Sequence, residues 1–141
     1  MLIKLPNLDY PAEKLLNLAR AAREAAYAPY SGFRVGAALL TPRGLAYKGC
    51  NVENASFGLT VCAERVALFK AVSEGERDFA ALAVTAGAEE YCVPCGACLQ
   101  ALAEFNPRLL ILMGNLRGEY LGRRLTELLP LAFQLPNPAR P

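Results

Sequence analysis

The sequence predicts an α/β fold with three layers, α/β/α, in which helices cover both faces of a mixed sheet of about five strands. The runs at 79–86 and 109–113 are almost wholly apolar, as is typical of strands buried on both faces. A helical segment lies between them, so the two runs form a parallel βαβ unit. The length of 141 residues suits one domain, and we expect a single domain over residues 1–141.

The first part of the chain predicts a helix followed by a β-hairpin. The helix is expected to begin at 9–11, with Pro11 at its first position. It should end before Ala28, because a residue that precedes proline avoids the helical conformation. A strand at 33–41 and its antiparallel partner at 45–52 follow, joined by a tight turn that contains proline and glycine.

The remaining elements alternate between helix and strand. Residues 51–59 are expected to be mostly loop, and the next helix runs from about 61 to 73 with Thr60 as its N-cap. We predict a further helix at 94–105, a short edge strand at 118–121 and a short helix at 125–129. The resulting order, α-β-β-α-β-α-β, supplies helices for both faces of one sheet.

The absence of histidine limits the chemistry of the chain more than any other feature of its composition. It excludes Ser-His-Asp and Cys-His catalysis within the chain, and any histidine-ligated metal. A general acid or base must therefore be Glu, Asp, Lys, Tyr or Cys, and a zinc site must use Cys and carboxylates. The net charge is only +2 and there is no basic run, so we expect no nucleic-acid partner.

The cysteines and the N-terminal sequence bear on the compartment. There are five cysteines, an odd number, so they cannot all pair. The N-terminus lacks the charged and long apolar regions of a signal peptide, and no charge-free run approaches the roughly 20 residues of a membrane span. We therefore expect a cytoplasmic protein with reduced thiols and no membrane partner. In that setting, closely spaced cysteines favour metal binding or catalysis over disulfides.

Three cysteines are placed to meet at one point. Cys95 and Cys98 are three positions apart at the start of one predicted helix, and Cys62 lies in the first turn of another. Helix N-termini favour thiolates, and three thiolates suit zinc with one coordination position left open for water. Glu64 follows Cys62 by two residues, which is roughly 200° around a helix. It is therefore poorly placed as a ligand but suits the role of a proton shuttle.

The charge of such a site calls for a positive neighbour. Zinc with three thiolates carries −1, which Arg65 and the two helix N-termini can offset, although Arg65 can also be an ordinary solvated charge. A Cys-x-x-Cys pair can instead be a redox pair or half of a structural zinc site. A structural site needs a fourth ligand, which Cys50 or Cys92 could supply. Otherwise we expect these two cysteines to be small buried apolar residues.

The similarity of the chain to a known family is carried by four segments: YAPYSGFRVGAALLT, YKGCNVENASFGLTVCAERVALFKA, VPCGACLQ and ELLPLAF. Together they resemble the zinc-dependent nucleoside deaminases, in particular the small homotetrameric cytidine deaminases. The resemblance implies a cytidine deaminase-like fold and one zinc per chain. It also implies hydrolysis of cytidine and 2′-deoxycytidine to uridine and 2′-deoxyuridine with release of ammonia, a reaction of pyrimidine salvage.

The resemblance also implies a role for each matching residue. Glu64 would move protons between water, the pyrimidine ring and the leaving amine, and Arg65 would offset the thiolate charge. The zinc ligands would be Cys62, Cys95 and Cys98. The ribose hydroxyl would be bound by Asn51 and Glu53, and the nucleoside would be contacted by Phe33 and by the backbone of Ala63. Phe133 would enter the site of a neighbouring subunit. The implied assembly is a homotetramer with shared active sites.

Three positions depart from the common family pattern, and three other functions remain open. Leu99 stands where arginine is usual, Val93 replaces a small polar residue, and Phe57 replaces a frequent tyrosine. One alternative is a deaminase of an aminoacyl-nucleoside antibiotic, although the ribose-reading segment 51–54 favours a plain nucleoside. A polynucleotide deaminase is disfavoured by the low net charge. A non-catalytic zinc-stabilised interaction domain is disfavoured by Glu64 at the spacing that a shuttle requires.

Overall fold

A mixed five-stranded sheet forms the middle layer of the computed structural model, which describes residues 1–136. Across the sheet the strands are β4 (Ala46–Cys50), β3 (Val35–Leu40), β5 (Ala81–Ala86), β6 (Leu110–Gly114) and β7 (Tyr120–Arg124). Strands β5 and β6 are parallel, and every other neighbouring pair is antiparallel. The predicted mixed sheet and its βαβ unit are therefore confirmed.

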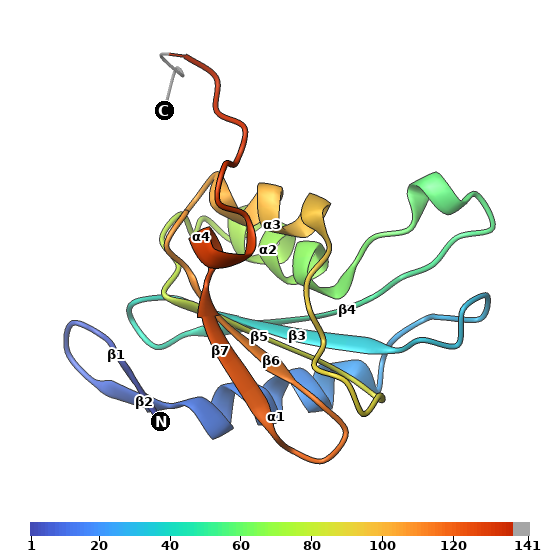
Figure 1. Ribbon diagram of the computed structural model, residues 1–141, viewed down its shortest axis with the longest axis horizontal. Coiled ribbons are helices and arrows are strands. Elements are labelled where there is room, and N and C mark those ends of the chain that lie inside the picture. Colours follow the sequence, from blue (N-terminus) through green and yellow to red (C-terminus); the bar gives the residue numbers. More distant parts are fainter. Residues whose placement is uncertain (137–141) are drawn as a thin grey trace.

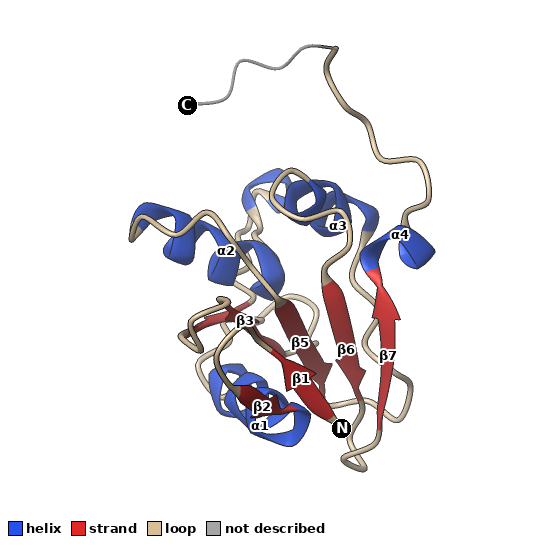
Figure 2. Cartoon of the chain, turned by 90° about the vertical axis from the view of Figure 1, so that its left-hand side faces the viewer, coloured by secondary structure: helices blue, strands red, loops and turns tan. Residues whose placement is uncertain are grey.

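Helices cover both faces of this sheet. Helix α1 (Ala12–Arg23) lies on one face. On the other face lie α2 (Ala63–Ser73), α3 (Gly96–Ala103) and α4 (Leu125–Leu128) (Figures 1 and 2). No helix in residues 1–136 is long and apolar enough to cross a membrane. The predicted three-layer α/β/α arrangement is confirmed.

Alternate residues of the central strands enter two separate cores. In β5, Leu82 and Val84 pack on the side of α2 and α3, whereas Ala81 and Ala83 pack on the side of α1. Side chains of a strand point alternately to its two faces, so a strand between two helical layers needs apolar residues at every position. This packing explains the uninterrupted apolar run at 79–86.

Two glycines allow the helices to approach the sheet closely. A Cβ at Gly49 of β4 would lie 2.4 Å from the nitrogen of Ala67 and 2.5 Å from the oxygen of Ala63, both in α2. A Cβ at Gly36 of β3 would lie 1.9 Å from the oxygen of Ala19 in α1. These positions therefore require glycine, and Gly49 fixes the height at which the first turn of α2 lies above the sheet.

Several expected boundaries were wrong. An additional antiparallel hairpin, β1 (Leu2–Lys4) with β2 (Asp9–Pro11), precedes α1, so Pro11 ends a strand and is the N-cap of the helix. Each of these strands has only three residues, too few to show a periodic pattern. The other end of α1 agrees with expectation, because the helix ends at Arg23, before Ala28.

The N-cap of α2 and the edge strand also differ from expectation. Thr60 is extended, and its hydroxyl accepts a hydrogen bond from the nitrogen of Asn54 at 3.1 Å, because a bridge between Val52 and Val61 keeps this segment out of the helix. Cys62 is the N-cap instead. The edge strand begins at Tyr120, since Gly118 has a positive φ of 81° in the turn before it.

Candidate active site

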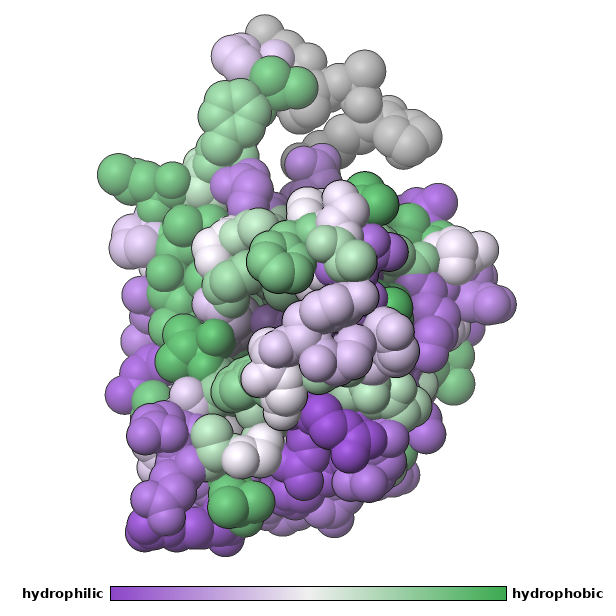
Figure 3. Space-filling model, turned by 90° about the vertical axis from the view of Figure 1, so that its right-hand side faces the viewer, coloured by the Kyte–Doolittle hydropathy of each residue, from purple (hydrophilic) through white to green (hydrophobic). Residues whose placement is uncertain are grey.

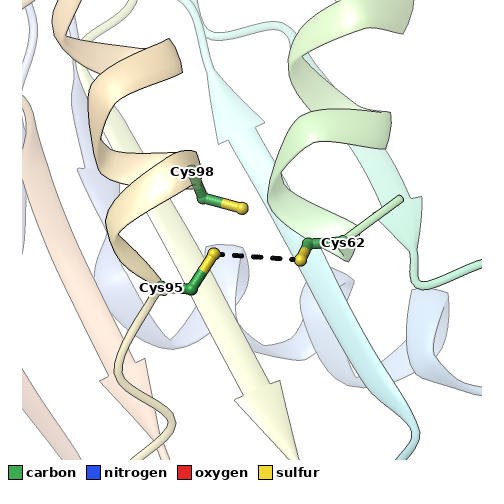
Figure 4. Close-up of side chains that lie close together, drawn as sticks. All are labelled: Cys62, Cys95 and Cys98. Carbon is green, nitrogen blue, oxygen red and sulfur yellow. Dashed lines mark hydrogen bonds between the residues drawn. The ribbon is translucent and has the colours of Figure 1, made fainter. Parts of the chain in front are cut away.

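The structure brings three cysteines together at the starts of two neighbouring helices. Cys62 is the N-cap of α2, Cys95 is the N-cap of α3, and Cys98 lies in the first turn of α3. Their sulfur atoms all lie within 4.8 Å of one another, and those of Cys62 and Cys95 are 4.0 Å apart. Figure 4 shows the three side chains pointing into the space between the two helix starts.

This sulfur cluster has the dimensions of a zinc site. Zn–S bonds of about 2.3 Å in a tetrahedral site place two sulfurs about 3.8 Å apart. Three thiolates at that spacing can hold the metal and leave one position for a water or substrate. Neither Cys50 nor Cys92 belongs to the cluster, which is the only group of its kind within residues 1–136. The arrangement therefore favours an open site over a closed four-cysteine site.

The charges around the cluster favour thiolates. The hydrogen bond from Cys98, together with the guanidinium of Arg65, lowers the pKa of Cys62 to about 5, against the opposing effect of burial. The same hydrogen bond and burial raise the pKa of Cys98. An Nη atom of Arg65 lies 3.5 Å from the sulfur of Cys62. The structure thus places a permanent positive charge against the cysteine cluster.

Glu64 is a buried carboxyl group beside the cysteines. Its side chain lies in the first turn of α2 and the residue is only 4% exposed. Burial raises its pKa to about 7, and the negative charge of Cys62 acts in the same direction. A carboxyl group with a pKa near neutrality can both accept and donate a proton at neutral pH.

A cavity of about 340 Å³ opens onto Cys62, Cys95 and Glu64. Its volume lies in the usual range for small-molecule sites. Its only carboxyl-bearing lining side chains, among the described residues, are Glu53 and Glu64. The complete lining consists of Ser31, Phe33, Val35, Asn51, Glu53, Thr60, Cys62, Ala63, Glu64, Cys92, Val93 and Cys95.

Most residues that the sequence singled out line this cavity, and three of them, Cys98, Arg65 and Phe133, do not. Phe33, Asn51, Glu53 and Ala63 line it with the metal-site residues. Phe133 lies instead beside α3, where its backbone nitrogen donates to Gln100 at 3.0 Å and its carbonyl accepts from the same side chain at 2.9 Å. Its own chain therefore does not bring Phe133 into the cavity.

The cavity also contains residues that the sequence did not single out as contacts. Cys92 was expected to be fully buried, but it is half-buried and lines the cavity, where burial raises its thiol pKa to about 12. Cys50 is half-buried as well. Ser31 also lines the cavity. Only its position in the turn just before Phe33, which also lines the cavity, could have indicated from the sequence that Ser31 lies there.

The three departures from the family pattern have different surroundings. Val93 lines the cavity, so this departure alters the wall of the site. Leu99 is buried in the core between α2, α3 and the sheet, where an apolar side chain fits. Phe57 is 76% exposed and makes an edge contact with Tyr30, with ring centroids 6.1 Å apart.

Asn51 holds the entrance strand of the cavity through both ends of its amide. Its nitrogen donates to the carbonyl of Phe33 at 2.7 Å, and its oxygen accepts from the nitrogen of Val35 at 2.9 Å. Asn51 is buried. It therefore fixes the backbone on either side of residue 34 and with it the place of the Phe33 ring.

The fold and the site define a zinc-dependent deaminase, and comparison with known proteins bears this out. Residues 10–113 match the cytidine and deoxycytidylate deaminase zinc-binding region, and the chain belongs to that family. It is 52% identical to a cytidine deaminase of Sporosarcina psychrophila over 122 residues, 86% of this chain and 90% of that protein. A cytidine deaminase of Halalkalibacterium halodurans is also 52% identical over 122 residues, 86% of this chain and 92% of that protein.

The fold agrees with a solved structure of the same kind. The crystal structure of cytidine deaminase from Burkholderia pseudomallei superposes with a TM-score of 0.85 at 48% identity, over 87% of this chain and 99% of that one. Similarity to a blasticidin-S deaminase of Bacillus cereus is lower, 29% identity over 107 residues, covering 70% of this chain and 76% of that protein. The cytidine deaminases are thus the better match over more of the chain.

Proposed function

We propose that the chain hydrolyses cytidine and 2′-deoxycytidine to uridine and 2′-deoxyuridine with release of ammonia. The observation that carries the proposal is a cluster of three cysteine sulfurs beside a buried carboxyl group, of which Cys62, Cys95 and Glu64 line one cavity. The similarity to cytidine deaminases over most of the chain supports the same reaction.

Cys62, Cys95 and Cys98 would hold the zinc that this family binds, one per chain. When bound, zinc would lower the pKa of a water molecule and so supply the nucleophile for hydrolysis. Arg65 and the N-termini of α2 and α3 would offset the excess negative charge of three thiolates.

Glu64 would carry the protons of the reaction. Its carboxylate would take one proton from the attacking water and deliver it to the pyrimidine ring. It would then take the second proton from the hydroxyl group so added, which becomes the carbonyl of the product, and deliver it to the leaving amino group. A pKa of about 7 suits both directions of transfer at neutral pH. The buried position of Glu64 keeps bulk water from supplying competing protons.

The remaining lining residues would position the nucleoside. Phe33 offers an aromatic ring to the flat pyrimidine, and the backbone of Ala63 lies where the edge of the base must approach the cysteines. Asn51 and Glu53 would bind the ribose hydroxyl. Contacts within the chain leave Asn51 one amide hydrogen and Glu53 about one acceptor position, and a sugar hydroxyl can use these whereas a free base has none to offer.

The assembly we propose is a homotetramer in which Phe133 enters a neighbouring subunit's site. The side chains of Leu131, Phe133 and Leu135 are 92%, 70% and 64% exposed. Figure 3 shows apolar side chains of this tail standing clear of the body of the molecule. A tail that exposes apolar groups in the single chain fits a segment that is covered in an assembly.

We place the reaction in the cytosol, where thiols remain reduced. The sulfurs of Cys62 and Cys95 lie close together, and a disulfide between them would remove two of the three metal ligands. A reducing compartment therefore suits this site.

The direct test is the fall in ultraviolet absorbance of cytidine on addition of the purified protein, with and without a chelator. Turnover that the chelator abolishes and zinc restores supports the proposal. Inactivity of the zinc-loaded protein on both nucleosides would refute it. An aminoacyl-nucleoside antibiotic, run in parallel, tests the alternative that the weaker similarity to a blasticidin-S deaminase raises.

A further inference from the structure

The carboxylate of Glu53 is held in place by the turn that precedes Phe33. One of its oxygens accepts hydrogen bonds from the backbone nitrogens of Tyr30 at 3.0 Å and Ser31 at 3.1 Å. The other oxygen accepts from the hydroxyl of Ser31. The turn and the segment that carries Glu53 extend from the same end of the sheet (Figure 1), so these contacts tie two loops together across the cavity.

The hydroxyl of Ser31 has no hydrogen left to donate to a ligand. Its hydrogen is donated to Glu53, and its oxygen accepts from the backbone nitrogen of Phe33 at 2.9 Å. Ser31 lines the cavity, yet its polar atoms are directed at the protein. The geometry is that of a group that orients another residue, as distinct from one that binds substrate itself.

The effect on Glu53 is to fix both its charge and its direction. The hydroxyl of Ser31 is the main cause that lowers the pKa of the Glu53 carboxyl, and the two backbone hydrogen bonds act in the same sense. An ionised carboxylate only accepts hydrogen bonds, at about four lone-pair positions. Three are used by the turn, so roughly one remains, and it can accept from a hydroxyl group in the cavity.

We propose that Ser31 is a positioning residue for substrate recognition, because it holds Glu53 as an oriented acceptor for one sugar hydroxyl of the nucleoside. This inference rests on the proposed function. A glutamate side chain has many rotamers in water, and holding one of them before the substrate arrives removes an ordering cost from binding. Specificity for that hydroxyl then depends on a serine that does not contact the substrate.

The test compares hydroxyl-free and hydroxyl-bearing variants at position 31. Ser31→Ala removes the contact, and Ser31→Gly is a second hydroxyl-free variant should the first misfold. Ser31→Thr retains the hydroxyl at an exposed position. Ser56→Ala, at an exposed serine outside the cavity, is the matched control. The kcat/KM of each zinc-loaded variant is measured on cytidine and on its 2′-, 3′- and 5′-deoxy analogues, with zinc content and Tm alongside.

We expect Ser31→Ala to lower kcat/KM for cytidine about 10-fold, the effect of one lost hydrogen bond. Ser31→Thr and Ser56→Ala should stay within about twofold of wild type, and zinc content should not change. The loss should vanish for the one analogue that lacks the hydroxyl bound by Glu53. In a Glu53→Ala background, Ser31→Ala should add less than about twofold.

Three results would overturn the inference while leaving the function intact. The first is an active Ser31→Ala enzyme with unchanged kcat/KM, and the second is an equal loss on all four nucleosides. The third is a full loss that persists in the Glu53→Ala background, which would assign Ser31 to the support of Phe33 alone. A wild-type enzyme that is inactive on all four nucleosides would refute the proposed function, and this inference with it.

Discussion

Gly49→Ala should damage the active site from the opposite side of helix α2. The new Cβ would lie 2.4 Å from the nitrogen of Ala67 and 2.5 Å from the oxygen of Ala63. Both are backbone atoms, so no side-chain rotation can relieve the contact. Ordinary contacts begin near 3.4 Å, and the start of α2 must therefore retreat from β4 by about 1 Å.

That movement acts on stability and on catalysis together. Forcing an extra methyl group into a packed interior costs about 1–3 kcal/mol. The retreating segment begins at Cys62 and includes Glu64, so the shuttle and one metal ligand move with it. A misplacement of about 1 Å at reacting groups can reduce the rate about 100-fold. We expect a loss of that size in kcat/KM, with weaker retention of zinc.

The assay pairs denaturant unfolding with the deamination rate and a zinc competition titration. Gly96→Ala is the matched control, because it lies in the other metal-binding helix, and a Cβ there has no atom within 4 Å. It should leave all three measurements near wild type. A Gly49→Ala enzyme with wild-type stability and rate would show that α2 does not depend on this close approach.

Three further predictions concern the site itself. Glu64→Ala should keep its fold and zinc but lose several orders of magnitude in rate, since each proton transfer contributes about 10²–10⁴-fold; a variant that keeps a tenth of the activity would exclude the shuttle role. Cys50→Ala and Cys92→Ala should bind zinc fully by metal analysis, and loss of metal from either would show that the ligand set is wrong. Phe133→Ala should weaken nucleoside binding about 5- to 150-fold, the value of one aromatic stack on a base. Mixed oligomers of Phe133→Ala and Glu64→Ala chains should be more active than the sum of their parents, and verified mixed oligomers without that gain would contradict a shared site.

The predictions of structure that were confirmed rest on sequence patterns in which buried positions are occupied by a recognisable run of apolar residues. The run 79–86 was identified as a doubly buried strand because every residue of β5 is buried. The hairpin β1–β2 left no such signature, since only Ile3 and Tyr10 of its six strand residues are buried. The prediction of Thr60 as the N-cap was wrong because its neighbour Val61 pairs with Val52, which lies outside the local pattern of the helix start. That pairing holds the segment extended.

The features of the candidate site can also be separated into those that the sequence predicts and those that only the structure shows. Local spacing predicted that the three cysteines and Glu64 lie at helix starts, and each does lie at the N-cap or in the first turn of α2 or α3. The contact between Ser31 and Glu53 spans 22 positions and depends on how two loops close over the cavity. The spacing of residues along a chain carries no record of such a closure, so only the three-dimensional structure shows it.

The attachment of the C-terminal tail has a consequence for how this enzyme can change. Gln100 grips residue 133 through main-chain atoms alone, with one hydrogen bond to the nitrogen and one to the carbonyl. Because these hydrogen bonds involve only backbone atoms of residue 133, they do not depend on the identity of its side chain. The side chain displayed at 133 can therefore be exchanged without loosening the tail from α3, the helix that also carries Cys95 and Cys98.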